Sequence, residues 1–301
     1  MVQTSGNFPQ LVDFDPVLTD LFYGQYERDL GDGGVMTLFA KRTSSKAKET
    51  DLQIGGFSDP ELFNGKVKYS DAERGYEIEY DFDEWVKGFQ ITRKMRDDMQ
   101  YDSIFANASE LATSFARKRR KDAASVFNNV ASSSYLGFDG KALAASDHPR
   151  SRTDTSNTKS NLNTLALTSA NLETAVTTMQ AFGDDLGEEI VIVPDVLVVP
   201  RALRKTALEI TGSPQVPENA NNAINVQAGN WRVIVDPYLS SSTAWFIIDS
   251  TLSQRYLKWY DRVMVEFAGQ EDWETMIWKY RGYARYGFGW SDWRFLYRGN
   301  S

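Results

Sequence analysis

The sequence predicts an α+β fold with unusually long elements. First, an apolar stripe at helical spacing crosses residues 102–130 with no Pro or Gly, which predicts one helix of roughly 40 Å. Second, residues 76–83 (YEIEYDFD) alternate strictly between apolar and acidic side chains, as a strand does. Third, residues 276–288 alternate between rings on one face and cations on the other, which predicts a strand far longer than average.

The N-terminal third is predicted to extend away from a core. Residues 1–49 have the pattern of an arm rather than a core element, because glycines interrupt them and the stretch 41–49 (KRTSSKAKE) is polar. Residues 50–92 predict an extended hairpin, with turn-forming residues at 57–65 (FSDPELFNG). The long helix then lies within residues 93–135.

The middle of the chain, residues 136–255, predicts a lobe of helices and strands with its own sheet. Thr168 is the expected N-cap of one helix, and a further helix follows Pro200. Residues 190–200 (IVIVPDVLVVP) predict a buried strand. Two more apolar strands are expected, at 231–235 (WRVIV) and 244–249 (AWFIID).

Residues 256–301 are predicted to close the fold with long strands. Val263, Val265 and Phe267 alternate along the first of them. A turn at 269–272 (GQED) is expected to lead into the ring-and-cation strand. Because the rings and the cations lie on opposite faces, this strand indicates a packed sheet rather than a surface on which nucleic-acid bases stack.

Composition excludes several classes of protein. The net charge is −8, from 33 basic and 41 acidic residues, which disfavours a dedicated nucleic-acid binder. The chain has no cysteine and one histidine, so thiol catalysis, disulfides and sites with several imidazoles are excluded. No signal peptide is expected, and no apolar run is long enough to predict a membrane helix.

No residue pattern predicts catalysis. Ser146, Asp147 and His148 are neighbours in sequence, and a catalytic relay needs its orienting carboxylate on the far side of the imidazole. The glycines at 31–34 lack the ending of a phosphate-binding loop. Carboxylates are plentiful, but nothing in the sequence places two of them in one cleft. We therefore expect no enzyme activity, no cofactor and no metal site.

Two charged rows are candidate contact surfaces. The acidic row alternates with apolar residues on one predicted strand, and is a solvated face or a docking face for a basic partner. Its members are Glu77, Glu79, Asp81 and Asp83. The basic row lies on the long helix, and is a solvated face, a DNA contact or an ion-pairing surface for a neighbouring subunit. Its members are Arg117, Lys118, Arg119, Arg120 and Lys121.

The elongated elements indicate a chain that needs partners, because one compact core cannot bury them all. Fragments in a fixed order strengthen this interpretation. They are RKDAASVFNN (120–129), DGKALAASDHP (139–149), SNLNT (160–164), LVVPRAL (197–203), AWFIID (244–249) and FGWSDWRFLY (288–297). Together they resemble the Mu-like prophage major head subunit (gpT) group of tailed-phage major capsid proteins, over about residues 75–299.

The resemblance implies the HK-ninety-seven-type capsid fold and a non-enzymatic role. Its parts would be an N-terminal arm (1–49), an extended loop (50–92), a peripheral domain with a spine helix (93–135), an axial domain (136–255) and closing peripheral strands (256–301). The family assembles hexamers and pentamers into an icosahedral shell around double-stranded DNA, so the protein is expected in the virion capsid, after assembly in the bacterial cytoplasm. With the spine helix beginning near residue 102, a separate scaffolding protein is expected, besides a portal and a candidate decoration protein.

Two other functions stay open on the sequence alone. A shell protein of an encapsulin-like cellular nanocompartment would share the fold and package an enzyme. A soluble, carboxylate-dependent hydrolase would instead show a cleft with two convergent carboxylates. For the phage protein, the acidic row is expected to dock on an adjacent subunit, with Arg117 to Lys121 as candidate partners.

Overall fold

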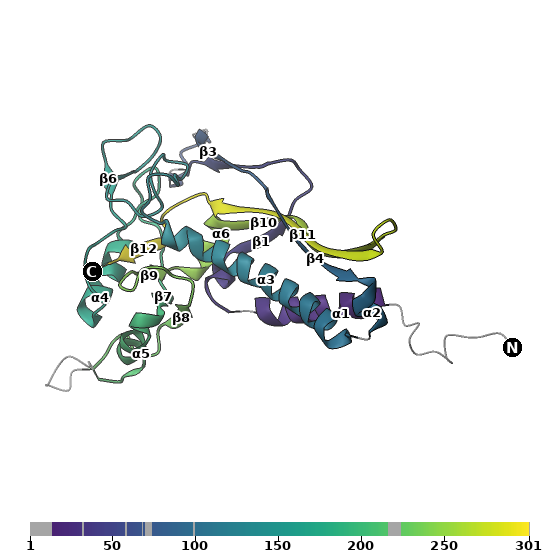
Figure 1. Cartoon of the computed structure of the whole chain (residues 1–301). Helices are drawn as coiled ribbons and strands as arrows, with labels where there is room; N and C mark the ends of the chain where they lie inside the picture. The colour runs from purple at the N-terminus through teal and green to yellow at the C-terminus, as the bar shows by residue number, and fades with distance from the viewer. Residues whose placement is uncertain are drawn as a thin grey trace. The chain divides into compact units, whose positions relative to one another are not determined.

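The computed structural model describes residues 14–31, 33–57, 59–67, 69, 74–98, 100–215 and 224–300, and Figure 1 labels its helices and strands. The chain divides into two compact units. The first takes its described residues from Met1–Asp32, Phe82–Lys121 and Asp261–Tyr286. The second takes its described residues from Gly33–Asp81, Asp122–Tyr260 and Gly287–Ser301. Each unit therefore assembles stretches that lie far apart in the sequence.

The first unit is built on three antiparallel strands. They are β4 (Asp83–Thr92) and the parts of β10 (Leu257–Asp272) and β11 (Ile277–Trp290) that fall in this unit, with β11 in the middle. β11 pairs with β4 from Ile277↔Thr92 to Tyr286↔Asp83. The predicted two-faced strand is confirmed, since Tyr280, Ala284 and Tyr286 are buried whereas Lys279 and Arg281 are exposed.

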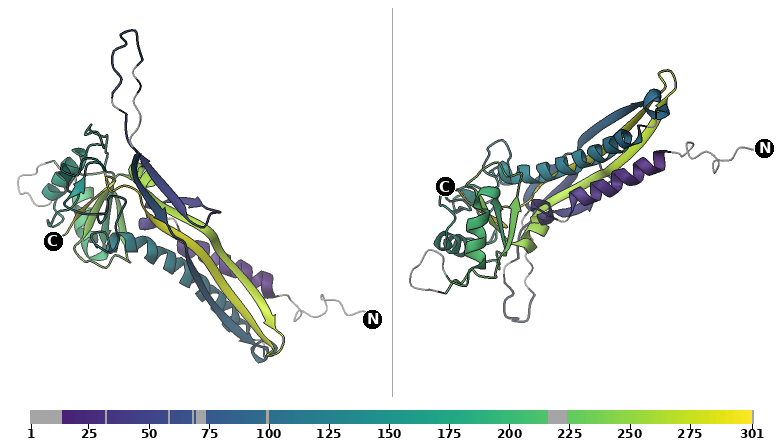
Figure 2. Two further views of the ribbon diagram at one scale, coloured as in Figure 1. Left: turned by 90° about the horizontal axis from the view of Figure 1, so that it is seen from above. Right: turned by 60° about the horizontal axis from the view of Figure 1, so that its bottom comes forward.

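Two helices, α1 (Phe14–Leu30) and α3 (Tyr101–Asn128), run alongside these strands (Figure 2). The long helix predicted at 102–130 is confirmed as α3. The short helix α2 (Arg93–Asp97), whose N-cap is Thr92, connects β4 to α3. One buried cluster joins α1, α3, β4 and β11, and its members are Leu18, Ile91, Ile104, Ala108 and Tyr280.

The prediction of an arm at residues 1–49 is wrong for residues 14–39; residues 1–13 lie outside the described residues. Leu18 and Phe22 of α1 are fully buried, and the Phe22 ring stacks on Phe267 with the centroids 4.7 Å apart. In the second unit, the 3₁₀ helix η3 (Val35–Leu38) is also buried. The physical reason is spacing, because residues four apart on a helix share one face and can bury together.

The second unit contains a mixed sheet in the order β12-β9-β7-β8. Its strands are β7 (Val196–Pro200), β8 (Arg232–Asp236), β9 (Trp245–Ile248) and β12 (Leu296–Gly299). β7 pairs parallel with β8 and antiparallel with β9. The predicted strands at 231–235 and 244–249 are confirmed as β8 and β9, whereas only the second half of 190–200 forms a strand.

The two helices predicted in this unit, after Thr168 and after Pro200, are present, and a helix that was not predicted follows Asp249. The helices of the unit are α4 (Ser169–Gln180), η4 (Arg201–Leu203), α5 (Arg204–Gly212) and α6 (Ser250–Tyr256). The N-cap prediction is confirmed, since the Thr168 hydroxyl accepts a hydrogen bond from the Asn171 amide. Two short strands, β5 (His148–Pro149) and β6 (Thr158–Lys159), pair in the loop before α4.

The predicted hairpin is shorter than residues 50–92. β2 (Glu49–Ile54) pairs antiparallel with β3 (Arg74–Tyr80), but β4 pairs with β11 instead. The strand predicted at 76–83 is therefore broken at Asp81 and Phe82. Alternation identifies a strand, but it does not specify which neighbouring strand will pair with it.

Two further corrections concern the closing strands. The turn expected at 269–272 lies within β10, which continues to Asp272. A β-carbon at Gly269 would lie 2.4 Å from the Tyr280 ring, so this glycine leaves room for the ring rather than forming a turn. The last strand, β12, pairs with β9 in the second unit, and the strand β1 (Ala40–Thr43) lies next to β10.

Candidate interaction surfaces

The residues considered for a catalytic relay do not form one. The His148 ring is fully buried and stacks on Trp293 with the centroids 4.3 Å apart. Its Nδ1 lies 2.6 Å from Asp139 Oδ2 and its Nε2 lies 3.1 Å from Asn161 Oδ1. Ser146 and Asp147 are exposed, and Asp147 pairs with Lys141. Both ring nitrogens of His148 are thus engaged in holding loops together.

A metal centre finds no support in the part of the chain that the structure describes. No three His, Cys, Asp or Glu side chains converge there. The acidic turn at 184–189 is organised by Asp184, whose Oδ1 accepts hydrogen bonds from the amides of Leu186, Gly187 and Glu188. Among the described helices, none combines the length and the apolar character needed to span a membrane.

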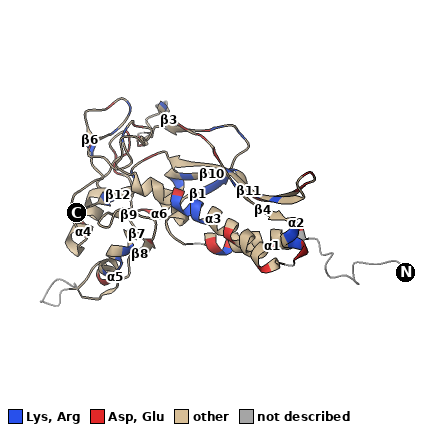
Figure 3. Ribbon diagram, viewed as in Figure 1, with Lys and Arg blue, Asp and Glu red and all other residues tan. Residues whose placement is uncertain are grey.

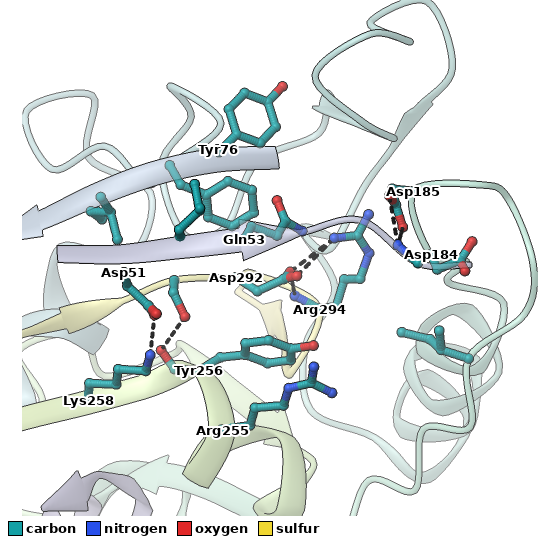
Figure 4. A pocket seen from close by; sticks show the side chains of 16 residues that line it. Asp51, Gln53, Tyr76, Asp184, Asp185, Arg255, Tyr256, Lys258, Asp292 and Arg294 are labelled. Carbon is teal, nitrogen blue, oxygen red and sulfur yellow. Dashed lines mark hydrogen bonds and ion pairs between the residues drawn. The ribbon is translucent and has the colours of Figure 1, made fainter. Parts of the chain in front are cut away.

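The second unit has a polar cavity of about 390 Å³ at the root of the β2–β3 hairpin (Figure 4). Lys258 pairs with Asp51, and the Arg294 Nη1 lies 3.0 Å from Asp292 Oδ2. Arg294 also donates to the carbonyls of Gly183 and Arg150. The Lys258–Asp51 pair ties β2 of the hairpin to the start of β10, and Arg294 ties together the segments that contain Arg150, Gly183 and Asp292.

Another contact fixes the same hairpin root. The Asp185 carboxylate accepts the amide hydrogen of Gly56 at 3.1 Å. Tyr76 packs its ring against Phe138 and donates its hydroxyl to the Ser151 carbonyl. Burial raises the pKa of the Tyr256 phenol in the cavity wall, which keeps this group neutral.

The acidic row is exposed but already has intramolecular partners. Glu77 pairs with Arg74 at 2.7 Å. Lys48 lies 3.3 Å from Glu79 and 3.0 Å from Asp81. All of these side chains are largely exposed, and exposed pairs stabilise a fold little. Asp83 begins β4 and belongs to the first unit, so the row is divided between the units.

The basic row does not lie on one surface, although Figure 3 shows cations gathered along this part of α3. Arg119 is buried and forms two bonds with Asp261. Although burial opposes its charge, neighbouring Tyr26 and Asp261 raise the pKa of Arg119. Arg120 donates from Nε and Nη2 to the Leu30 carbonyl, at the C-terminal end of α1. Arg119 and Arg120 therefore have structural roles within the unit.

The remaining three cations of the row line a groove of about 260 Å³ on the first unit. Its lining residues are Trp85, Val86, Lys87, Ser114, Phe115, Arg117, Lys118 and Lys121. The Lys118 ammonium lies over the Trp85 ring, 3.5 Å from the centroid. Arg117 and Lys121 are exposed. The sequence analysis did not identify Lys87 or Trp85. The available signal was that Lys87 lies between Trp85 and Phe89 on one face of the strand, where an apolar side chain would be expected.

Comparisons with known proteins agree with the fold. The family model described as "Phage capsid protein" matches residues 75–299. No match was found among curated protein sequences. A virus-like particle from Pyrococcus furiosus has a similar structure, with a TM-score of 0.58, 10% identity, and coverage of 96% of this chain and 100% of that chain.

Two phage structures also resemble this chain in fold. The procapsid of bacteriophage JBD30 has a TM-score of 0.53 and 14% identity, and the match covers 95% of this chain and 74% of that chain. Microbacterium phage Oxtober96 has a TM-score of 0.54 and 11% identity, and the match covers 86% of this chain and 85% of that chain. At these identities the likeness establishes the fold, which is the predicted HK-ninety-seven-type capsid fold.

Proposed function

Since the chain belongs to the phage capsid protein family, we propose that its copies assemble as hexamers and pentamers into a closed icosahedral shell around double-stranded DNA. The observation that carries this proposal is the family match over residues 75–299. The exposed apolar side chains of an extended segment support it. Phe57, Leu62 and Phe63 lie in the β2–β3 connection and are at least 66% exposed. Apolar surface of this kind is typical of subunits that are completed by neighbours.

The finer assignments are part of the same proposal. The chain would belong to the Mu-like prophage major head subunit (gpT) group. The protein would have no catalytic activity, and would assemble in the bacterial cytoplasm with a separate scaffolding protein, a portal and a candidate decoration protein. The extended loop would be the β2–β3 hairpin, the spine helix α3, and the axial domain the lobe that contains the β12-β9-β7-β8 sheet.

The alternative of an encapsulin-like nanocompartment shares the fold, and the family match does not favour it. Its distinguishing property is the cargo. A phage shell would protect DNA from nuclease after packaging, whereas a nanocompartment would enclose an enzyme.

The test is to express the chain with and without its neighbouring genes, and to examine the product by analytical ultracentrifugation and electron microscopy. We expect closed particles of uniform diameter, far larger than the 34.1 kDa monomer. Particles that require a co-expressed gene would identify the scaffolding protein. A compact monomer under every co-expression condition would contradict the proposal.

A further inference from the structure

The polar cavity at the root of the β2–β3 hairpin has the size of a small-molecule site. Its volume of about 390 Å³ lies within the range of about 300–1,000 Å³ that such sites occupy. Several separate stretches of the second unit form its wall (Figure 4), and they include residues from 51–56, 184–190, 255–258 and 291–294. Because the Lys258–Asp51 pair joins two of these stretches, the cavity is already formed in the single subunit.

The charges around the cavity are of both signs. Four carboxylates and three cations line it, and they are Asp51, Asp184, Asp185, Asp292, Arg255, Lys258 and Arg294. Two of the cations are already paired, Lys258 with Asp51 and Arg294 with Asp292. An anion would be repelled by the carboxylates and a cation by the basic groups, so the lining favours a ligand without net charge.

Several polar groups of the lining have unused hydrogen-bonding capacity. The side chains of Gln53, Arg255 and Tyr256 form no hydrogen bond with any described residue. The Arg255 guanidinium lies over the Tyr256 ring, 5.2 Å from the centroid, and burial raises the pKa of Tyr256, so its hydroxyl keeps the proton and can donate it. Asp184 uses Oδ1 for three backbone amides of its own turn, which leaves Oδ2 as an acceptor.

A ligand with many hydroxyl groups matches this set of donors and acceptors. Each hydroxyl can both donate and accept, so it can bond to a guanidinium, an amide or a carboxylate. An apolar ligand would instead cover Gln53, Arg255 and Asp184 without replacing their bonds to water, which costs free energy. The polar part of the lining therefore favours a polyhydroxylated, uncharged molecule.

Aromatic rings supply the apolar part of the wall. Tyr76 of β3 and Phe138 both line the cavity, and their ring centroids are 5.0 Å apart with the planes tilted by 54°. The hydroxyl of Tyr76 is held by the Ser151 carbonyl, which fixes the position of its ring. A sugar ring has an apolar face of C–H groups and a rim of hydroxyls, so it can pack on such rings while its rim bonds to the polar groups.

We propose that this cavity binds a neutral saccharide of one or two sugar units. Its hydroxyl groups bond to Gln53, Arg255 and Asp184, and one face of a sugar ring packs on Tyr76 and Phe138. The site lies within one unit of one chain, so binding does not require assembly. Saccharide recognition is thus an activity beyond the proposed function.

Titrations of the full chain with defined probes test the class of ligand. Maltose, cellobiose and N,N′-diacetylchitobiose are the neutral probes, and saturation-transfer NMR with isothermal titration calorimetry measures their binding. We expect at least one of them to bind with a Kd of about 1 mM or lower. Inorganic phosphate and spermidine are the anionic and cationic probes, and neither is expected to give saturable binding at the same concentrations.

Two substitutions in the lining locate the bound saccharide. Arg255→Met and Gln53→Leu each remove hydrogen-bonding groups from the cavity, and each is expected to raise the Kd by about tenfold or more. Arg255 is exposed and holds no other part of the fold by a hydrogen bond, so its variant is expected to fold, which circular dichroism checks. Arg201→Met, which removes an exposed arginine outside the cavity, is the matched control and is expected to bind as wild type does.

Three results would overturn the inference. If none of the three disaccharides gave saturable binding up to about 20 mM, the cavity would not be a saccharide site. If Arg255→Met and Gln53→Leu bound the disaccharide as tightly as wild type, the sugar would bind elsewhere on the chain. Phosphate binding that Arg255→Met abolishes would assign the cavity to an anion. Because none of these measurements needs an assembled shell, their outcome is independent of the proposed function.

Discussion

Arg119 of α3 and Asp261 of β10 form a buried ion pair that is held by two hydrogen bonds. Nη1 lies 2.9 Å from Oδ1 and Nη2 lies 2.9 Å from Oδ2, with side-chain exposures of 5% and 9%. The planar guanidinium suits this paired geometry. The Arg119 guanidinium also lies over the Tyr286 ring at 5.5 Å, so α3, β10 and β11 meet at this arginine.

The first prediction concerns this pair. Arg119→Met should lower the free energy of unfolding of the isolated subunit by about 3–5 kcal/mol, because the buried Asp261 carboxylate would lose both hydrogen bonds and the charge of the guanidinium. Arg117→Met, two positions away and exposed, should change it by less than about 0.5 kcal/mol. Urea unfolding followed by tryptophan fluorescence measures both values. Equal effects of the two substitutions would mean that Arg119 is not buried in solution.

The second prediction concerns α1 as part of the core. Phe22→Ala removes a fully buried ring that stacks on Phe267, and should cost about 3–5 kcal/mol. Val17→Ala, on the exposed side of the same helix, should cost less than about 1 kcal/mol. Thermal unfolding of the unassembled subunit compares the two. If α1 were instead a detached arm, neither substitution would change the melting temperature.

Hydrophobic periodicity predicted correctly the helices and strands whose pattern is visible within one stretch of sequence. The stripe of α3 and the alternation of β11 are visible within single stretches of sequence, and both were confirmed. In α1 the same signal was present, since Leu18, Phe22 and Tyr26 are four residues apart, but nearby glycines and polar residues led to the prediction of an arm. Those glycines follow the end of a packed helix.

The features that the sequence did not predict depend on contacts between residues that lie far apart in the chain. Five consecutive cations look equivalent in the sequence, and Asp261, the ion-pair partner of the buried Arg119, lies 142 residues away from it. In the same way, alternation at 83–92 identifies a strand but not its pairing with β11. The groove is a property of β4 and α3 together, so neither element reveals it alone.

The third prediction uses two glycines with opposite surroundings. A β-carbon at Gly282 of β11 would lie 2.4 Å from the Phe115 ring, so Gly282→Ala should cost about 1–3 kcal/mol. Among the described residues, no atom other than those of the adjacent α1 backbone lies within 4 Å of the same position at Gly24, so Gly24→Ala should stabilise the helix by about 0.5–1 kcal/mol. Opposite shifts in melting temperature are expected. A stabilising Gly282→Ala would show that α3 packs less closely on β11.

The fourth prediction is a pH dependence at the contact between α1 and α3. The Thr113 hydroxyl donates to Asp29 Oδ2 at 2.5 Å, and Gln25 donates to Oδ1 at 2.9 Å. These bonds favour the ionised carboxylate, with the Thr113 bond the larger cause, and they lower the pKa of Asp29 below its ordinary value of 3.8. A carboxylate whose pKa is lowered on folding stabilises the folded state at pH values above its ordinary pKa. This stabilisation is lost as the pH falls through the folded-state pKa.

Thr113→Val should therefore destabilise the subunit by about 0.5 kcal/mol at pH 7, a small value because solvent partly screens this site. The difference from wild type should shrink as the pH falls below about 3.8, where the Asp29 carboxylate becomes protonated. Thr113→Ser keeps the hydroxyl and should retain the wild-type pH dependence. Urea midpoints between pH 7 and pH 2.5 measure all three proteins. A constant difference between Thr113→Val and wild type across this range would mean that the hydroxyl does not stabilise the charged form of Asp29.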